Sequence, residues 1–478
     1  MNVNLVWFRN DLRIHDNTAL YQACKNKIQK VIAIFIATPK QWNSHFMSFK
    51  QSSFIYKHLI LLEKNLNLLG IPFFYYEKPN FDASIPFLIE FCKKKHVKTL
   101  FFNKQYEINE KNRDKKIKKL LCLENISMIG YHDSIIVSPK LIYNSEKKKY
   151  IKYTPFKNKV FSYLDNKKIK CFPTPDICFK RIKDTSSKIS YFSFPKEEFS
   201  TKLFPVGEDH AIQQLNTFFK KKYFNYALNR NFFGLNSTSL LSPYLSIGIL
   251  SPRQCLAKIF KEKISFKNIN NDKMTWLNEL IWREFYKHTL NSYSLIGKEE
   301  SIFFWEKKIK WNNNNQYFSF WKKGLTGYPI IDAAMRQLKK IGWMHNRLRM
   351  ITASFLTKNL LIDWRKGARY FMSQLIDGDF SSNIGGWQWT ASVGFDSVPY
   401  FRIFNPTIQS KKFDPEGKFI YSFIPELKKV PVKFIHNPEE WKDKKENNIN
   451  YPSPIVNYQL TKKKFCEEFK KAKNNKEN

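Results

Sequence analysis

A carboxylate and an indole lie one helical turn apart in the segment 276–286, whose sequence is WLNELIWREFY. The spacing predicts a helix in which Glu279, Trp282 and Tyr286 share one face. An indole on a cleft wall can stack on a nucleic-acid base, and a neighbouring carboxylate can accept hydrogen bonds from a base edge. The alternative is a half-buried stripe with Glu279 paired to Arg283 at i+4, and the helix taken alone favours it. The other face is apolar and carries Leu277, Ile281, Phe285 and His288.

A second motif, WMHNRLRM, covers residues 343–350. Gly342 is expected to end one helix, and Asn346 is a suitable cap for the next. Capping does not explain Arg347 and Arg349, because basic charge in a first turn opposes the helix dipole. Their placement is typical of a helix N-terminus that faces an anion.

Two polar segments are candidates for holding a heterocycle and its phosphates. Residues 377–389 read DGDFSSNIGGWQW, which is not a calcium loop because Ser382 and Gln388 stand where glycine and glutamate are required. This loop is either a simple turn or a close backbone approach to a ring system. Residues 237–242 read STSLLS, which suits a helix cap or a diphosphate cradle.

Composition narrows the function classes. The 478 residues carry a net charge of +40, which favours a polyanionic partner, although 68 of the 81 basic residues are lysines that base-composition drift alone would explain. Nine of 13 arginines lie between Arg230 and Arg402, and nine of 12 tryptophans between Trp276 and Trp389. The seven scattered cysteines argue against disulfide frameworks and zinc sites, and no hydrolase, zinc-protease or P-loop motif is present. We see no secretory signal or membrane span, and expect a cytoplasmic protein.

Hydrophobic patterning predicts an α/β domain at residues 1–131 with a doubly wound parallel sheet. Its expected strands are Val3–Phe8, Lys30–Ala37, Pro72–Tyr76, Thr99–Asn103 and Ser127–Tyr131, and its expected helices include Ser48–Leu69, Phe81–Lys95 and Glu107–Leu123. Residues 132–205 are expected to be an irregular linker. Residues 206–461 are expected to be all-α, and 462–478 a frayed tail. The clearest helices there are Thr275–Asn291, Pro329–Ile341, Arg347–Leu361 and Arg365–Leu375.

Taken together and in order, these segments resemble the photolyase/cryptochrome family, and most of all bacterial class I cyclobutane-dimer photolyases. The stretch VWFRNDLR at 6–13 is similar to the family's opening strand and loop, and 276–288, 327–364 and 374–406 are long matches. The resemblance implies an antenna domain, a linker and a helical domain that holds FAD. It also implies light-driven splitting of cyclobutane pyrimidine dimers in DNA, with an electron from excited reduced flavin.

The resemblance assigns roles to individual residues. The flavin contacts it implies are Tyr226, Thr238, Ser239, Leu240, Leu241, Ser242, Asp377, Gly378, Asp379 and Asn383. The DNA contacts it implies are Arg230, Glu279, Leu280, Ile281, Trp282, Arg283, Glu284, Phe285, Tyr286, Asn346, Arg347, Met350 and Gln409. Glu279 and Asn383 are also expected to be catalytic, and Trp387, Trp364 and Trp311 to form an electron-transfer chain from the flavin outward. An antenna, 5,10-methenyltetrahydrofolate, is expected at His45, Asn109, Glu110 and Lys298, and no metal is expected.

One position departs from the family, whose hydroxyl-rich turn usually carries arginine where this chain has Leu240. Two other function classes remain as alternatives. A flavin photoreceptor without repair activity is disfavoured by Asn383, where plant cryptochromes carry aspartate. A non-enzymatic DNA-binding protein is disfavoured by the clustered tryptophans. We expect a monomer.

Overall fold

The computed structural model describes residues 3–26, 29–176, 189, 191–260, 263–266, 269–443 and 449–474. The chain forms two compact units, each assembled from separate stretches of sequence. The first comprises Met1–Lys221, Ser239–Gly297 and Ile376–Ser381, and the second comprises Lys222–Thr238, Lys298–Leu375 and Ser382–Asn478.

A five-stranded parallel sheet forms the core of the first unit. Its strands are β1 (Val3–Phe8), β2 (Lys30–Ala37), β3 (Phe73–Glu77), β4 (Val97–Asn103) and β5 (Ser127–Tyr131). They are arranged in the order β3-β2-β1-β4-β5, with the first strand in the centre. All strand neighbours are parallel, which confirms the doubly wound sheet and its five predicted strands.

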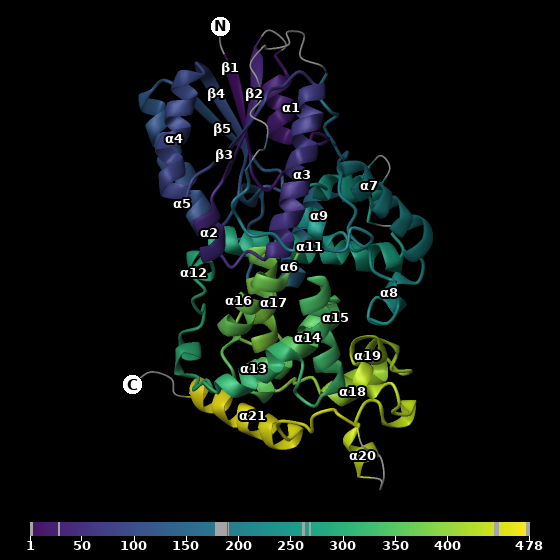
Figure 1. Ribbon diagram of the computed structural model, residues 1–478. Coiled ribbons are helices and arrows are strands. Elements are labelled where there is room, and N and C mark those ends of the chain that lie inside the picture. The colour runs from purple at the N-terminus through teal and green to yellow at the C-terminus, as the bar shows by residue number, and fades with distance from the viewer. Residues whose placement is uncertain are drawn as a thin grey trace. The chain divides into compact units, whose positions relative to one another are not determined.

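Helices cover both faces of this sheet (Figure 1). On one side lie α4 (Phe81–Lys94) and α5 (Ile108–Leu123), and on the other lie α1 (Thr18–Cys24) and α3 (Phe49–Leu68). Leu88 of α4 and Ile117 of α5 are completely buried against the strands. A sheet covered on both faces explains why its strands read as continuous apolar runs.

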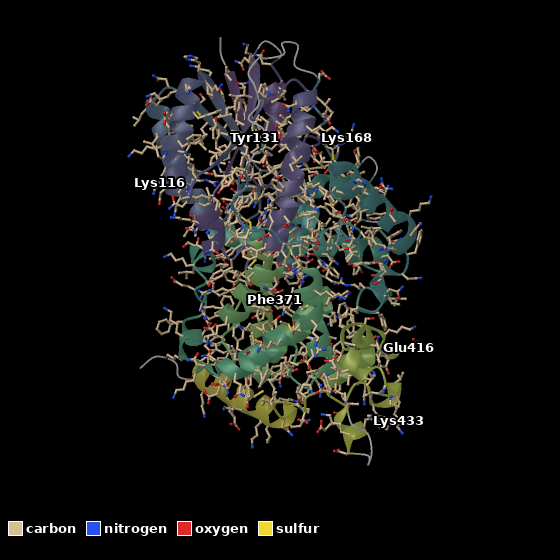
Figure 2. The ribbon with its side chains drawn as sticks, viewed as in Figure 1. Lys116, Tyr131, Lys168, Phe371, Glu416 and Lys433 are labelled. Atoms are coloured by element: carbon tan, nitrogen blue, oxygen red, sulfur yellow. The ribbon has the colours of Figure 1, made fainter. Side chains whose placement is uncertain are left out.

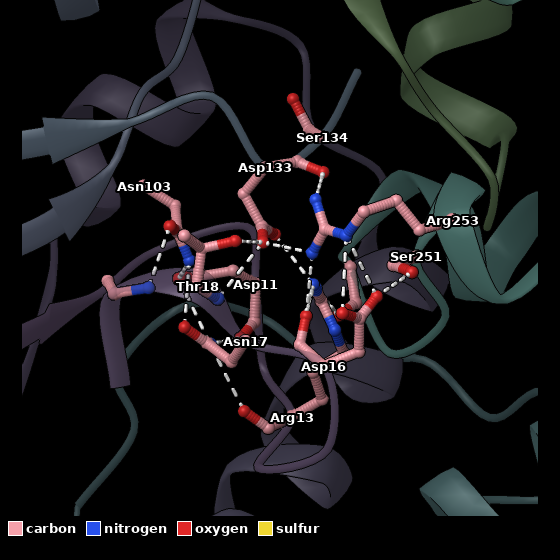
Figure 3. A network of polar contacts seen from close by, with 12 residues as sticks. Asp11, Arg13, Asp16, Asn17, Thr18, Asn103, Asp133, Ser134, Ser251 and Arg253 are labelled. Atoms are coloured by element: carbon pink, nitrogen blue, oxygen red, sulfur yellow. Dashed lines mark hydrogen bonds and ion pairs between the residues drawn. The ribbon is translucent and has the colours of Figure 1, made fainter. Parts of the chain in front are cut away.

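A buried polar network lies beyond the carboxyl ends of β1, β4 and β5 (Figure 3). Asp133 contacts Arg13 at 2.6 Å and Arg253 at 2.7 Å, and Arg253 also contacts Asp16 at 3.1 Å. Asp16 further accepts a hydrogen bond from Ser251, which caps α10 (Pro252–Ile259). Burial would raise the pKa of Asp133, but the two guanidinium groups hold it far below its ordinary value. The network therefore joins the loops of the sheet to the helices that follow residue 239.

Of the remaining helices of the first unit, α2 (Pro39–Ser44) lies between strands of the sheet in the sequence and the others lie in the linker or after it. The others are η1 (Pro139–Leu141), α6 (Tyr153–Leu164), α7 (Glu208–Thr217), α9 (Ser242–Ser246), α10, α11 (Asn271–Ser292) and α12 (Ser294–Gly297). The prediction of irregular structure throughout 132–205 was wrong for α6. Pro155 indicated a loop there, but proline is tolerated in a first helical turn, and Phe156 and Val160 give α6 a buried side. Residues 177–188 and 190 of this segment lie outside the described residues.

Among its described residues, the regular secondary structure of the second unit is all helical. Its longer helices are α13 (Asn315–Lys323), α14 (Pro329–Ile341), α15 (Asn346–Ser354), α16 (Trp364–Gln374), α18 (Pro406–Phe413) and α21 (Tyr458–Asn474). Its shorter elements are α8 (Tyr226–Asn229), η3 (Phe304–Lys308), η4 (Phe355–Asn359), α19 (Lys418–Phe423), η5 (Pro425–Leu427), η6 (Val432–Phe434) and α20 (Glu439–Lys442). The chain crosses between the units within η2 (Phe218–Lys222) and α17 (Phe380–Ala391).

Two predictions for the second unit were wrong. The helix expected at Arg347–Leu361 is divided into α15 and the π turn η4, in which Lys358 is buried and donates a hydrogen bond to Ser392 at 2.8 Å. The tail expected to fray from 462 is instead part of α21 up to Asn474. Phe465, Phe469 and Ala472 recur at helical spacing and are buried, which holds α21 in place despite its many lysines.

Charged side chains such as Lys116 and Lys433 are exposed, whereas Phe371 is buried (Figure 2). Within the described stretches, every helix is too short or too polar to cross a bilayer.

We predict that Arg253→Met destabilises the protein by about 3 kcal/mol, because it leaves two buried carboxylates with one guanidinium fewer. Urea unfolding followed by circular dichroism measures this. Lys116→Met is the control, because it removes an exposed ion pair with Asp82 and is expected to change stability by less than about 0.5 kcal/mol. Equal midpoints for the two variants would contradict the role of the network.

Candidate functional site

The helix α11 has the two faces that its sequence predicts. Leu277, Ile281, Phe285 and His288 are buried, whereas Glu279, Trp282 and Tyr286 are partly exposed. The guanidinium of Arg283 donates to the backbone oxygens of Ser134 at 2.6 Å and Leu245 at 3.2 Å. Arg283 therefore fixes α11 to the linker and to α9, both of which precede it in the sequence. The partly exposed face of α11 carries the carboxylate and the indole.

Four residues that were predicted to contact DNA from this helix are buried and support it. They are Leu280, Ile281, Glu284 and Phe285, none of them more than 6% exposed. The carboxylate of Glu284 accepts hydrogen bonds from the backbone N–H groups of Ile136 and Val137, each at 2.9 Å. These side chains hold the linker against α11, and their contact with DNA stays a prediction.

The loop at 377–379 is anchored to α11 and α3 within the first unit. Lys287 contacts the carboxylate of Asp379 at 2.8 Å, and Gln51 donates to the backbone oxygen of Gly378 at 2.7 Å. Burial would raise the pKa of Asp379, but Lys287 and Arg283 hold it far below its ordinary value, so this carboxylate is ionised. Sequence reasoning missed Lys287, although a lysine on the buried side of a helix is a signal for a buried partner.

The hydroxyl-rich turn precedes α9. Gln214 of α7 donates to the backbone oxygens of Ser239 at 3.1 Å and Leu240 at 3.0 Å. Leu240 has a φ of 53°, a left-handed conformation that is uncommon for a side chain of this size. Leu241 is buried and Ser242 begins α9. Strain held in place by surrounding contacts is typical of a ligand-binding turn. Tyr226 and Thr238 belong to the second unit.

A basic cluster lies at the start of α15 in the second unit. Arg347 donates to Asn231 at 2.7 Å, next to Arg230 in the chain, and its guanidinium lies 4.9 Å from the ring of Phe413 at the end of α18. His345 is buried, and burial together with Arg347 and Arg230 lowers its pKa to about 4. Arg230 and Arg347, two of the three arginines predicted to contact DNA, are therefore brought close together around a neutral histidine.

The N-cap of α15 is His345, whose Nδ1 accepts from the backbone N–H of Arg347 at 3.1 Å. The interpretation of Asn346 as the cap was wrong, since Asn346 is the first helical residue and is exposed. Met350 and Gln409 are partly exposed in the same unit, on α15 and α18. Asn346 does not cap the helix, so capping does not explain an amide at this position, and contact with a ligand stays its predicted role.

The three tryptophans of the predicted chain lie in the second unit, and two of them are buried. Trp387 and Trp364 are 3% and 0% exposed, and Trp311 is partly exposed. The indole N–H of Trp364 donates to the buried carboxylate of Glu306 at 3.0 Å. Arg365 pairs with the same carboxylate at 2.9 Å, and its guanidinium lies 4.7 Å from the Trp364 ring, so both charges of this ion pair lie beside the indole.

Trp387 is placed by α16 and α17. A side chain at Gly367 of α16 would overlap the indole of Trp387, so glycine permits that contact. Phe371 packs edge-on against Trp387 with ring centroids 5.0 Å apart. One hydrogen of the Asn383 amide is used by the backbone oxygen of Ala368, at 2.9 Å. α16 therefore orients both the indole and the amide of α17.

Three of the four predicted antenna residues meet at one edge of the first unit. His45 Nε2 lies 3.0 Å from Asn109 Nδ2, and its Nδ1 lies 3.8 Å from Glu110. Glu110 is buried, and among the described residues its Oε2 has no hydrogen-bond partner. Burial and the neighbouring Glu107 raise the pKa of Glu110 to about 7. Lys298 is exposed and belongs to the second unit.

Comparison with known proteins agrees with this geometry. Residues 4–176 match the family described as DNA photolyase, and residues 276–471 match the family described as FAD binding domain of DNA photolyase. The chain is 51% identical to a protein of Buchnera aphidicola subsp. Baizongia pistaciae named deoxyribodipyrimidine photo-lyase, over 99% of both chains. The chain belongs to the DNA photolyase family.

Solved structures of photolyase and cryptochrome proteins share its fold. A bacterial class III photolyase from Agrobacterium tumefaciens has a TM-score of 0.84 and 30% identity, and covers 99% of this chain and 98% of its own. A cryptochrome of Synechocystis has a TM-score of 0.84 and 28% identity, with 98% of this chain and 99% of its own covered. The α/β and helical FAD-domain architecture predicted from the sequence is thereby confirmed.

We predict that Glu110→Gln makes the protein more stable than wild type at about pH 8, by about 2 kcal/mol, and leaves its stability near that of wild type at about pH 5. A carboxyl whose pKa is higher in the folded than in the unfolded state favours folding at low pH. That contribution is lost as the pH rises toward 7, and an amide avoids the loss. Thermal unfolding at the two pH values measures the difference.

The control is Glu90→Gln, which changes an exposed glutamate of α4 and should give no pH-dependent gain. If the stability difference between Glu110→Gln and wild type were the same at both pH values, burial would not raise the pKa of Glu110 as the structure indicates.

Proposed function

We propose that this photolyase-family protein uses light to split cyclobutane pyrimidine dimers in DNA and restore the two pyrimidines. The observation that carries the proposal is full-length identity of 51% to a relative named deoxyribodipyrimidine photo-lyase, combined with the exposed carboxylate and indole on α11. Because its substrate would be chromosomal DNA, we place the protein in the cytoplasm. We also propose that it acts as a monomer.

The residues present fit FAD as the cofactor. The loop at 377–379 offers acidic groups that accept hydrogen bonds from ring N–H and hydroxyl groups, and Lys287 fixes the Asp379 carboxylate. Tyr226 and the stretch 238–242 are proposed for the phosphates, with Leu240 at the position where other members carry arginine. Reduced FAD, when bound, would supply under light the electron that opens the cyclobutane ring and take it back afterwards. Asn383 would donate a hydrogen bond without adding negative charge near an anionic flavin.

Four side chains are proposed as contacts of the damaged bases. Glu279 would accept hydrogen bonds from the dimer and Trp282 would stack on it, and Asn346 and Met350 are proposed as further contacts. Enzymes of this type flip the target out of the duplex, a step for which photolyases are themselves a general example. A dimer pairs and stacks poorly, so it costs less to extrude than an intact pair, which contributes to selectivity.

Basic side chains would contact the DNA strand beside the lesion. Arg230 and Arg347 are proposed for this role, and their proximity around His345 supports it. The neutral amide of Gln409 is proposed as a further hydrogen-bonding contact to the strand. Because the pKa of His345 is about 4, the histidine would stay neutral and leave the positive charge to the arginines. Phosphate contacts of this kind weaken as salt concentration rises.

Trp387, Trp364 and Trp311 would pass electrons inward to an oxidised flavin. Two of the rings are buried and the outermost ring is partly exposed, which suits a path between the interior and a reductant in solvent. This path would restore the reduced cofactor and would not take part in repair itself.

A folate antenna is proposed at His45, Asn109 and Glu110 of the first unit, and Lys298 of the second unit stays a separate prediction. The support is the buried Glu110 carboxyl, one oxygen of which has no hydrogen-bond partner among the described residues. A carboxyl with a pKa near 7 can either donate or accept, which suits the N–H and carbonyl groups of a pterin ring.

The test of the proposed function is illumination of the purified, reduced protein with an oligonucleotide that contains one thymine dimer. Restored thymines support repair. A yellow protein that leaves the dimer intact would be a photoreceptor, and a colourless protein that binds DNA would be a non-enzymatic binder, and either result rejects the proposal.

We predict that Glu279→Ala lowers affinity for the dimer roughly tenfold while flavin content is unchanged, because hydrogen bonds to base edges contribute about 1–3 kcal/mol. Binding to labelled dimer-containing and undamaged oligonucleotides measures this. Asp272→Ala removes the same charge from the first turn of α11 and should leave binding unchanged. Wild-type affinity in Glu279→Ala would exclude Glu279 from the pocket.

We predict that Trp311→Phe greatly slows photoreduction of oxidised flavin but leaves repair by chemically prereduced enzyme at the wild-type rate. Phenylalanine keeps the packing and is far harder to oxidise than tryptophan. Absorbance of the flavin under blue light follows the change, and Trp441→Phe, in α20, is the control. A slower repair rate in the prereduced variant would argue against a relay and for a structural role.

A further inference from the structure

Trp282 has one broad ring face covered by another aromatic side chain. The phenol ring of Tyr153 lies parallel to the indole, with ring centroids 3.7 Å apart and planes 1° apart. Tyr153 is 7% exposed and begins α6, whereas Trp282 is partly exposed on α11. An indole has two broad faces, so a flat ligand has only the opposite face of Trp282 available for stacking.

The position of Tyr153 is itself fixed at both ends of its side chain. Its hydroxyl donates to the backbone oxygen of Asn278 at 3.1 Å, one helical turn before Trp282. Its ring packs edge-on against Phe285, at 6.0 Å and 84°. Phe156, one turn later in α6, packs against Phe285 and His288 and so holds α6 along α11.

The other aromatic contacts of Trp282 differ from the stack with Tyr153. Phe285 meets it edge-on at 5.8 Å and 84°, and Tyr286 is tilted by 35° at 5.6 Å. Neither lies parallel to the indole as Tyr153 does. The stack therefore restricts rotation of the Trp282 side chain before any ligand binds. The entropy cost of ordering this side chain then does not reduce the free energy of binding.

We infer that Tyr153 is a positioning residue for substrate recognition: it presents Trp282 as a one-sided, pre-ordered stacking surface for a flat, base-like ligand. This inference rests on the proposed function of Trp282 in binding the damaged bases. The parallel stack between two separate helices carries it, because a tyrosine needed only for packing has no reason to lie flat on a partly exposed indole.

Tyr153→Leu tests the inference, with Tyr153→Met as a second replacement that fills the same space with a more adaptable side chain. We expect either variant to bind a dimer-containing oligonucleotide about five- to tenfold more weakly, which is part of the roughly 1–3 kcal/mol that a base–aromatic stack contributes. Affinity for undamaged DNA and flavin content should stay at wild-type values. The KM of repair should rise, while kcat of the prereduced enzyme at saturating dimer should not change.

Two variants separate positioning from general packing. Tyr153→Phe keeps the ring that stacks on Trp282 and loses only the hydrogen bond to Asn278, so it should restore dimer affinity to within about twofold of wild type. Tyr150→Leu removes a ring of the same size from the same segment, where it packs on Phe156 and not on Trp282, and should leave dimer affinity unchanged.

A double-mutant cycle gives the decisive outcome. In a Trp282→Leu background, Tyr153→Leu should cause no further loss of dimer affinity, because its effect acts through the indole. Equal losses in both backgrounds, or wild-type affinity in Tyr153→Leu and Tyr153→Met, would overturn the inference. Failure of the wild-type protein to bind or repair dimers would instead reject the proposed function, so the two failures are distinguishable.

Discussion

The first unit depends on two buried carboxylates that are held between two guanidinium groups. Asp16 and Asp133 follow strands of the sheet, and Arg253 belongs to a helix more than 100 residues further along the chain. Buried charges are tolerated only when they are paired, so these loops and α10 have one mutual arrangement in which none of them is left uncompensated. The turn at 239–242 and the helix α11 lie on either side of α10 in sequence. Their placement against the sheet therefore follows from an electrostatic requirement and not from apolar packing alone.

The same logic recurs at the positions we assign to ligands, with less complete compensation. Asp379 is matched by Lys287 and Arg283, so its charge is stable without a ligand. Glu110 has one carboxyl oxygen without a partner among the described residues, and Leu240 holds a left-handed backbone. At Glu110 and Leu240, a bound group would add the contact that the protein itself does not supply.

The sequence allowed the sheet, the two faces of α11 and most helices to be predicted, because apolar spacing reports burial directly. It failed where local signals pointed away from the tertiary result. Pro155 indicated a loop where α6 forms. The many lysines of α21 indicated a frayed tail, although three of its residues are buried at helical spacing. Asn346 is the better cap by preference, yet His345 takes that position because the surrounding arginines and burial keep its ring neutral and able to accept. Contacts between distant segments, such as Lys287 with Asp379 or Tyr153 with Trp282, leave no trace in local spacing.

The glycine of α16 has a consequence for charge movement. Gly367 weakens its helix relative to alanine, yet it lets the Trp387 indole rest on main-chain atoms. A ring seated on backbone cannot shift by a simple rotamer change of its neighbour, and it moves only if the helix moves. Electron tunnelling falls steeply with separation, so in the proposed relay the innermost gap would be set by the rigidity of a helix. The yield of photoreduction should then be nearly insensitive to solvent viscosity and to side-chain fluctuations nearby.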